Sequence, residues 1–151
     1  MDADTGVDAN LTRMSGSGPR FDQPLIEEEG EPFWEALKTD TLLIKKCNAC
    51  GAFHYYPRPF CPKCWSEDVE WYEASGKATV YTYSTVYRND LPPFPSQVPY
   101  VAAVVELVEG PRMMTRLIDC TKDDITLGMS VEVDYEDLDG ELKVAVFRPA
   151  A

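Results

Sequence analysis

The sequence predicts a mainly β protein with short N-terminal helices, a small four-cysteine ribbon and a C-terminal five-stranded barrel. Two observations carry this prediction. Two C-x-x-C pairs occur close together within residues 41–74, and a series of alternating or apolar segments separated by turn residues fills residues 75–151. The length of 151 residues suits one domain with a stabilised appendage, and 44% hydrophobic residues can form a core.

The composition is strongly acidic, with 14 Lys and Arg against 26 Asp and Glu and a formal net charge of −12. Such a chain repels bulk nucleic acid. One segment, residues 36–65, is instead basic, because Asp40 is its only acidic residue. We call this segment the basic island, and a small anion could bind to it. The basic residues of the island are Lys38, Lys45, Lys46, Arg58 and Lys63.

No apolar run approaches the roughly 18 residues that a membrane span needs. The N-terminus, MDADTGVDAN, lacks the apolar stretch of a secretory signal. We therefore expect a cytoplasmic protein that does not contact a membrane.

The N-terminal region divides into two parts. Residues 1–20 have no apolar periodicity and contain a Ser/Gly run, so we expect a disordered tail. Within residues 21–40 we expect two short helices, 24–29 and 31–38, separated by Gly30. Phe33, Trp34 and Leu37 share one helical face, which packs either on the rest of the chain or on a partner protein.

Residues 41–74 contain the strongest chemical signal. Two knuckles would place four thiolates around one tetrahedral metal ion, which predicts structural zinc because no coordination position remains for a catalytic water. The ligands are Cys47, Cys50, Cys61 and Cys64. Iron in the same site would instead make a rubredoxin-like electron carrier. His54, the only histidine, is expected to be a packed or solvent-facing ring, and Cys120 a small buried hydrophobe.

Residues 75–151 are expected to form a barrel of the OB-fold type, since a sandwich needs about seven strands. Asp139-Gly140 is a hairpin signal, and residues 121–128 suggest a short helical turn or loop. The apolar segment 100–108 is expected to be buried on both faces. The expected strands are 78–87, 100–108, 112–120, 129–138 and 141–149.

Alternation within residues 78–87 places Tyr81, Tyr83 and Tyr87 on one face. These rings could stack on bases, as in OB-folds that bind single-stranded nucleic acid, or could pack across strands. The acidic charge of the barrel favours packing, because phosphate contacts dominate the affinity of nucleic-acid binders. With one histidine and no glycine-rich phosphate loop, the chain is better suited to binding than to catalysis.

Three segments together resemble one family over residues 21–150: EPFWEALKTDTLLIKKCNACGAFHYYPRPFCPKC, VPYVAAVVELVEGPRMMTRLIDC and the closing FRPA. The family comprises zinc-ribbon/OB-fold acyl-CoA-associated proteins, long catalogued as a domain of unknown function. The resemblance implies a rubredoxin-like zinc ribbon whose ligands match Cys47, Cys50, Cys61 and Cys64 one for one.

The resemblance also implies a non-catalytic accessory subunit that binds a thiolase-fold enzyme and helps to form its acyl-CoA site. Partners of such proteins include thiolases, acyltransferases, hydroxymethylglutaryl-CoA synthase and steroid side-chain aldolases, so a hetero-oligomer is expected. For coenzyme A itself, charge and position favour Arg58, Lys63 and Arg88 near the phosphates and Tyr87 near the pantetheine.

Overall fold

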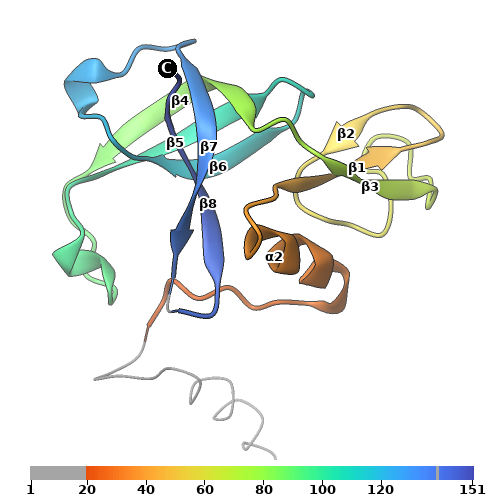
Figure 1. Ribbon diagram of the computed structural model, residues 1–151, viewed down its shortest axis with the longest axis horizontal. Coiled ribbons are helices and arrows are strands. Elements are labelled where there is room, and N and C mark those ends of the chain that lie inside the picture. The colour runs from red at the N-terminus through yellow and green to blue at the C-terminus, as the bar shows by residue number, and fades with distance from the viewer. Residues whose placement is uncertain (1–19, 139) are drawn as a thin grey trace, which may run out of the picture.

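The computed structural model describes residues 20–138 and 140–151. A three-stranded sheet lies on one side of the molecule and a closed five-stranded barrel on the other, with a short helix below and between them (Figure 1). The mainly β fold predicted from the sequence is therefore confirmed. The predicted disordered tail, residues 1–20, lies outside the described residues except for Arg20.

The N-terminal helical region begins later than expected. A 3₁₀ turn, η1 (Glu28–Gly30), leads directly into the helix α2 (Glu31–Leu37). The predicted helix at 24–29 is wrong, because residues 22–27 form no regular structure. Glu27, within the expected helix, has extended backbone, with φ −90° and ψ 163°. No helix in the described residues is both long and apolar enough to cross a membrane.

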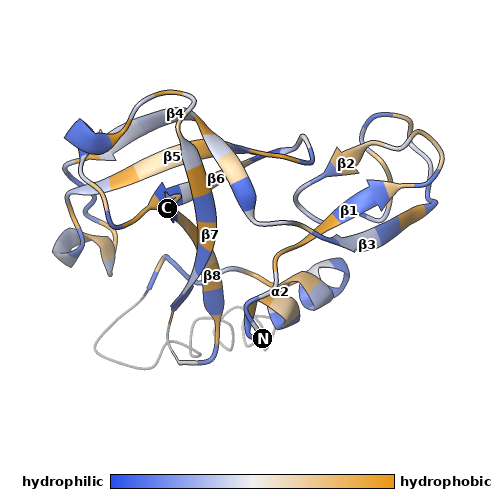
Figure 2. Cartoon of the chain, turned by 45° about the horizontal axis from the view of Figure 1, so that its top comes forward, coloured by the Kyte–Doolittle hydropathy of each residue, from blue (hydrophilic) through white to orange (hydrophobic). Residues whose placement is uncertain are grey.

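Helix α2 packs within its own chain. It contacts the first strand of the ribbon and the last strand of the barrel, and its Phe33 and Leu37 side chains are buried. Hydrophobic and hydrophilic residues alternate around the helix, as expected for a half-buried element (Figure 2). Of the two alternatives, packing on the rest of the chain is therefore confirmed for Phe33 and Leu37, and packing on a partner protein is wrong.

The ribbon is built around β1 (Leu43–Cys47), the central strand of an antiparallel sheet in the order β2-β1-β3. Its neighbours are the short β2 (Phe53–His54) and β3 (Val69–Glu73). Leu42 and Ile44 are buried and belong to the same hydrophobic core as the helix and the barrel. The ribbon therefore has no separate core away from its cysteines.

The barrel closes in the strand order β4-β5-β6-β8-β7, and β7 pairs back onto β4. Among the described residues, its only parallel pair joins β6 to β8, at Leu117 and Phe147. Two 3₁₀ turns, η2 (Phe94–Ser96) and η3 (Lys122–Asp124), lie between strands. The strands are β4 (Lys77–Val86), β5 (Tyr100–Leu107), β6 (Arg112–Leu117), β7 (Ser130–Asp137) and β8 (Lys143–Pro149). The predicted five-stranded barrel is confirmed, as is the β7–β8 hairpin, although Asp139 lies outside the described residues.

A β-bulge divides the tyrosine face predicted for β4. The register with β5 shifts between Val80 and Thr82, so the inward and outward positions exchange after the bulge. Tyr81 is exposed, whereas Tyr83 packs against the core and its hydroxyl donates to the Ile125 carbonyl at 3.4 Å. A continuous stacking platform of three tyrosines is therefore not formed.

The expectation that residues 100–108 are buried on both faces is also wrong. Along β5, alternate residues from Val101 to Leu107 are buried, and Ala102 and Val104 on the other face are partly exposed. Apolar colour nevertheless covers most of the strand (Figure 2). The outer side of a closed barrel has no second layer above it within this chain, which explains the exposure.

The ribbon and barrel meet at a constrained link. Gly76 adopts φ +81°, and a Cβ built on it would lie 2.5 Å from Cγ1 of Val133. Its carbonyl accepts a hydrogen bond from the Val133 N–H at 2.8 Å, and the Ala74 N–H donates to the Leu42 carbonyl at 2.9 Å. Backbone hydrogen bonds therefore tie the link to both sides, and glycine is required at its centre.

Candidate metal centre and binding surfaces

The two C-x-x-C knuckles have the same backbone hydrogen bonds. The Cys47 N–H donates to the Ala52 carbonyl at 2.8 Å, and Cys61 repeats this bond with Ser66 at 2.8 Å. Four residues after each first cysteine, the backbone N–H returns to that cysteine's carbonyl and the residue has positive φ. This residue is Gly51, at φ +78°, in one knuckle and Trp65, at φ +67°, in the other.

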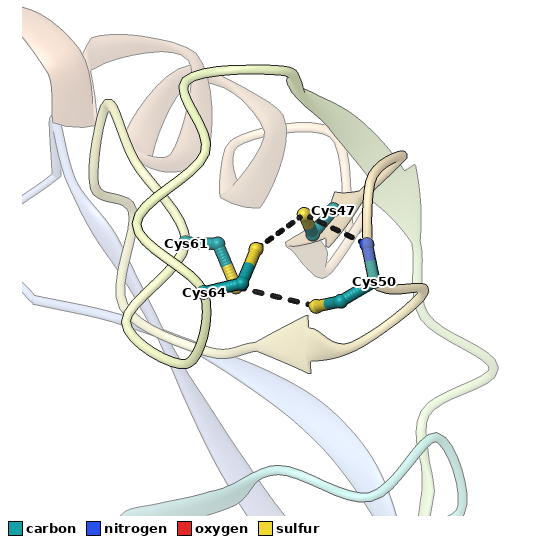
Figure 3. A group of neighbouring side chains, drawn as sticks. All are labelled: Cys47, Cys50, Cys61 and Cys64. Atoms are coloured by element: carbon teal, nitrogen blue, oxygen red, sulfur yellow. Dashed lines mark hydrogen bonds between the residues drawn. The ribbon is translucent and has the colours of Figure 1, made fainter.

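The four predicted ligands converge on one point (Figure 3). All four sulfur atoms lie within 4.8 Å of one another. The Sγ atoms of Cys47 and Cys64 are 3.6 Å apart, and those of Cys50 and Cys61 are 3.7 Å apart. Ligands about 2.3 Å from a tetrahedral zinc ion have sulfur separations of about 3.8 Å. The site therefore fits one zinc ion held by Cys47, Cys50, Cys61 and Cys64.

Backbone amides prepare two of these thiols to bind metal. A hydrogen bond from the Cys64 N–H lowers the pKa of Cys61 to about 7, with a further contribution from the Lys63 N–H. The Cys50 N–H donates to Cys47 Sγ at 3.5 Å and lowers the pKa of that thiol in the same way. Because zinc binds the thiolate, these bonds favour the ligating form.

The remaining histidine and cysteine do not form a catalytic pair. His54 is buried in β2, opposite Lys45 of β1, and is not part of the four-sulfur cluster. Cys120 follows β6 in the barrel, and burial together with Asp124 and Asp119 raises the pKa of its thiol. A protonated thiol without a base is a poor nucleophile.

The residues predicted for coenzyme A lie in two separate places. Arg58 and Lys63 are exposed in the ribbon, whereas Tyr87 and Arg88 follow β4 at the end of the barrel far from the ribbon (Figure 1). Arg88 forms a two-point ion pair with Asp90, with contacts of 3.1 and 2.9 Å. One ligand phosphate cannot contact all three predicted cations in this arrangement.

Tyr87 lines a pocket of about 580 Å³ at this end of the barrel. Two cations that the sequence analysis did not select also line it. Lys122 donates to the Tyr87 hydroxyl at 3.2 Å, and Arg116 contacts both carboxylate oxygens of Glu136, at 2.6 and 2.8 Å. Apolar side chains and Cys120 complete the wall, including Val101 and Leu117.

No sequence signal could have selected Lys122 in advance. It lies in η3, after β6, and it meets Tyr87 because β4 and β6 both pair with β5 in antiparallel fashion and so end at the same edge of the barrel. Alternation along β6 gives the face of Arg116 but not its neighbours, so its place in the pocket could not be predicted either.

Comparison with known proteins assigns both halves of the chain. Residues 34–70 match a family model described as the ChsH2 rubredoxin-like zinc ribbon domain, and residues 71–136 match the ChsH2 C-terminal OB-fold domain. A DUF35 domain-containing scaffold protein of Methanocaldococcus jannaschii is 38% identical over 104 residues, which cover 68% of this chain and 73% of the relative.

A probable enoyl-CoA hydratase alpha subunit of Thermomonospora curvata is 40% identical over 128 residues, or 85% of this chain. The matched part spans only 40% of that longer protein. Among solved structures, a chain of an Ltp2-ChsH2(DUF35) aldolase superposes with a TM-score of 0.77 and 40% identity. That match covers 85% of this chain and the whole of the other.

Proposed function

Because this chain belongs to the ChsH2/DUF35 family of zinc-ribbon and OB-fold proteins, we propose that it is a non-catalytic subunit of an acyl-CoA-processing enzyme complex. Its partner is a thiolase-fold enzyme of the aldolase type. In this assembly the partner supplies the reacting groups, and the present chain binds the partner and helps to form its acyl-CoA site.

One observation carries the proposal. The chain matches the complete length of one subunit of the Ltp2-ChsH2(DUF35) aldolase at 40% identity, with both the ribbon and the barrel included. Relatives named as DUF35 scaffold proteins support the non-catalytic role. The hydratase alpha subunit of Thermomonospora curvata supports the link to acyl-CoA chemistry, through a protein much longer than its matched region.

The chemistry of the described residues agrees with a role in binding. The four cysteines saturate a tetrahedral metal ion and leave no open position for a substrate. His54 is buried in the ribbon, and the raised pKa of Cys120 keeps that thiol protonated. Neither residue provides the activated nucleophile that acyl transfer needs.

For the coenzyme we propose the end of the barrel rather than the ribbon. Tyr87 and the apolar wall of the 580 Å³ pocket offer a surface for the pantetheine arm. Arg88, the next residue, would meet a phosphate after separating from Asp90. Arg58 and Lys63 belong to the ribbon, on the other side of the molecule (Figure 1), and neither lines this pocket.

The proposal is tested by mixing the zinc-loaded chain with the Ltp2 subunit of the solved aldolase complex. We expect co-elution at a fixed ratio in size-exclusion chromatography with light scattering. We also expect retro-aldol cleavage of acyl-CoA by the mixture and none by this chain alone. Turnover by the isolated chain would contradict the non-catalytic role, and separate elution would contradict the proposed partner.

A further inference from the structure

Trp65 occupies a backbone position that suits glycine. The first knuckle places Gly51 there, at φ +78°, and the second repeats the same hydrogen bonds with Trp65 at φ +67°. A bulky residue in this conformation is a genuine outlier, and such outliers cluster where a site needs them. Metal binding does not require the side chain, because the Gly51 knuckle supplies its two sulfurs without one.

The Trp65 side chain, held by this unfavourable backbone conformation, points into solvent. Trp65 is 71% exposed, the second most exposed large hydrophobic residue in the described part of the chain. Its ring stacks on Phe60 with centroids 5.3 Å apart and planes 15° from parallel. The stacked pair presents a preformed flat aromatic surface, the kind of anchor that dominates binding energy at protein interfaces.

The charges around the pair are unusual for this molecule. Outside the ribbon, seven of the nine described lysines and arginines pair with a carboxylate, the exceptions being Lys77 and Lys122. The four ribbon cations have no ion pair among the described residues. Lys45 and Lys46 lie over the Trp71 and Phe53 rings. Arg58 lies two residues before Phe60 and Lys63 two residues before Trp65, and both are exposed. The acidic Glu67 and Asp68, which follow Trp65, are exposed as well.

We infer that the aromatic knuckle, defined as Phe60 and Trp65 with the flanking Arg58 and Lys63, docks on an acidic protein surface. The occupant is a face of the enzyme subunit that carries carboxylates around an apolar contact, so this inference rests on the proposed function. At net charge −12 two copies of the present chain repel over their whole surfaces, whereas an enzyme subunit needs carboxylates only where the knuckle docks. The same charge opposes nucleic acid.

The test measures, by isothermal titration calorimetry, how tightly the present chain and its variants bind the Ltp2 subunit of the solved aldolase complex. Trp65→Gly should weaken binding by about 10- to 100-fold, the usual range for losing an interface anchor. Lys63→Glu should weaken binding as well, and it should reduce the loss of affinity caused by added salt. Leu127→Ser is the matched control, since Leu127 is similarly exposed, at 67%, but lies in the barrel.

Zinc content and the thermal midpoint of each variant separate docking from folding. Glycine suits the backbone at position 65, so Trp65→Gly should keep its zinc and melt close to the wild type. Lys63→Glu leaves the knuckle backbone unchanged and provides a second, independent variant.

The outcomes are distinct. If the wild type binds and Trp65→Gly binds equally well, the inference is overturned and the proposed function stands. If the wild type does not bind, both fail. If Trp65→Gly loses zinc while Lys63→Glu binds normally, Trp65 is purely structural and the inference is overturned. Binding of a single-stranded oligonucleotide that is lost in Trp65→Gly would also overturn it.

Discussion

The ribbon is organised around the four sulfur atoms of its cysteines, whereas the barrel is stabilised by a closed ring of paired strands and the apolar side chains inside it. Within the ribbon, the residues between the two knuckles form only the two-residue strand β2, which contains the buried His54. The ligands Cys47 and Cys61 are buried in the knuckles themselves. The barrel buries Val80, Val105 and Phe147 at 2% exposure or less. One region therefore depends on a metal ion and the other on apolar packing, although both share one core.

Removing the metal should produce the largest difference in stability between the ribbon and the barrel. Structural zinc supplies about 10–16 kcal/mol in small finger peptides, more than the ribbon can replace from its own packing. We expect Cys61→Ser, or chelation of the wild type, to unfold residues 41–74 and leave the barrel closed. Hydrogen exchange should show lost protection in β1 and β3 and retained protection in β5 and β6.

Cys120→Ser is the matched control for this experiment, because Cys120 lies outside the four-sulfur cluster. It should retain zinc and full protection in β1. Loss of the barrel together with the ribbon after chelation would show that the shared core makes the two regions one cooperative unit.

The reverse experiment removes packing from the barrel. Phe147 is fully buried on β8, next to the parallel contact with Leu117. Phe147→Ala should lower the free energy of unfolding by about 3–5 kcal/mol, the usual cost of a large core cavity. Urea unfolding of the zinc-loaded protein measures this loss. Phe21→Ala, at a site 55% exposed, should change it by less than about 0.5 kcal/mol.

The link between the regions provides a third test. Gly76→Ala would force a Cβ to within 2.5 Å of Val133 at a backbone angle of φ +81°. We expect a loss of about 1–3 kcal/mol, from strain and from displacement of Val133. Gly128→Ala isolates the contribution of the clash, because Gly128 has φ +84° but no atom within 4 Å of the added Cβ. Equal losses in thermal unfolding would mean that the clash contributes nothing.

The smallest expected effect is a pH dependence confined to the ribbon. Burial is the main cause that lowers the pKa of His54 below its usual value of about 6.5, and the charges of Lys45 and Arg58 add to it. As the pH falls through about 6.5, His54 therefore binds a proton more readily in the unfolded chain than in the folded one. Stability should therefore fall as the pH drops through about 6.5 and level off below the folded pKa.

His54→Phe should remove this part of the pH dependence and keep the part caused by protonation of the cysteines. Urea midpoints of both zinc-loaded proteins, compared between about pH 7.5 and 5.5, measure the difference. If the urea midpoints of the two proteins changed equally with pH, His54 would make no contribution to the pH dependence of stability.

The sequence allowed the metal ligands to be predicted because zinc binding depends on residue type and short spacing. Cys47 and Cys50 are joined by one turn, and so are Cys61 and Cys64, so local sequence determines the pairs. The strands of the barrel were predictable for a similar reason, since alternation and turn residues such as Gly140 act over a few positions.

Features that depend on the pairing of strands could not be predicted in this way. The bulge between Val80 and Thr82 appears only in the register of β4 against β5, whereas alternation alone puts Tyr81 and Tyr83 on the same face. The pairing of Lys122 with Tyr87 likewise joins segments far apart in the chain. The helix expected at 24–29 does not form, since Glu27 is extended, and no residue pattern places the start of helical backbone at Glu28 rather than at Pro24.

The position of β8 in the barrel has a consequence for the order in which the protein can form during synthesis. All the residues of the ribbon precede the barrel, so the ribbon can take up metal once Glu73 has left the ribosome. The barrel cannot close at that stage, because β8 lies between β6 and β7 and is the last of the five barrel strands to be made. Since nascent chains fold from their N-terminal end, the metal-loaded ribbon would be the first ordered part, with the open edges of β6 and β7 unpaired until Lys143–Pro149 arrive.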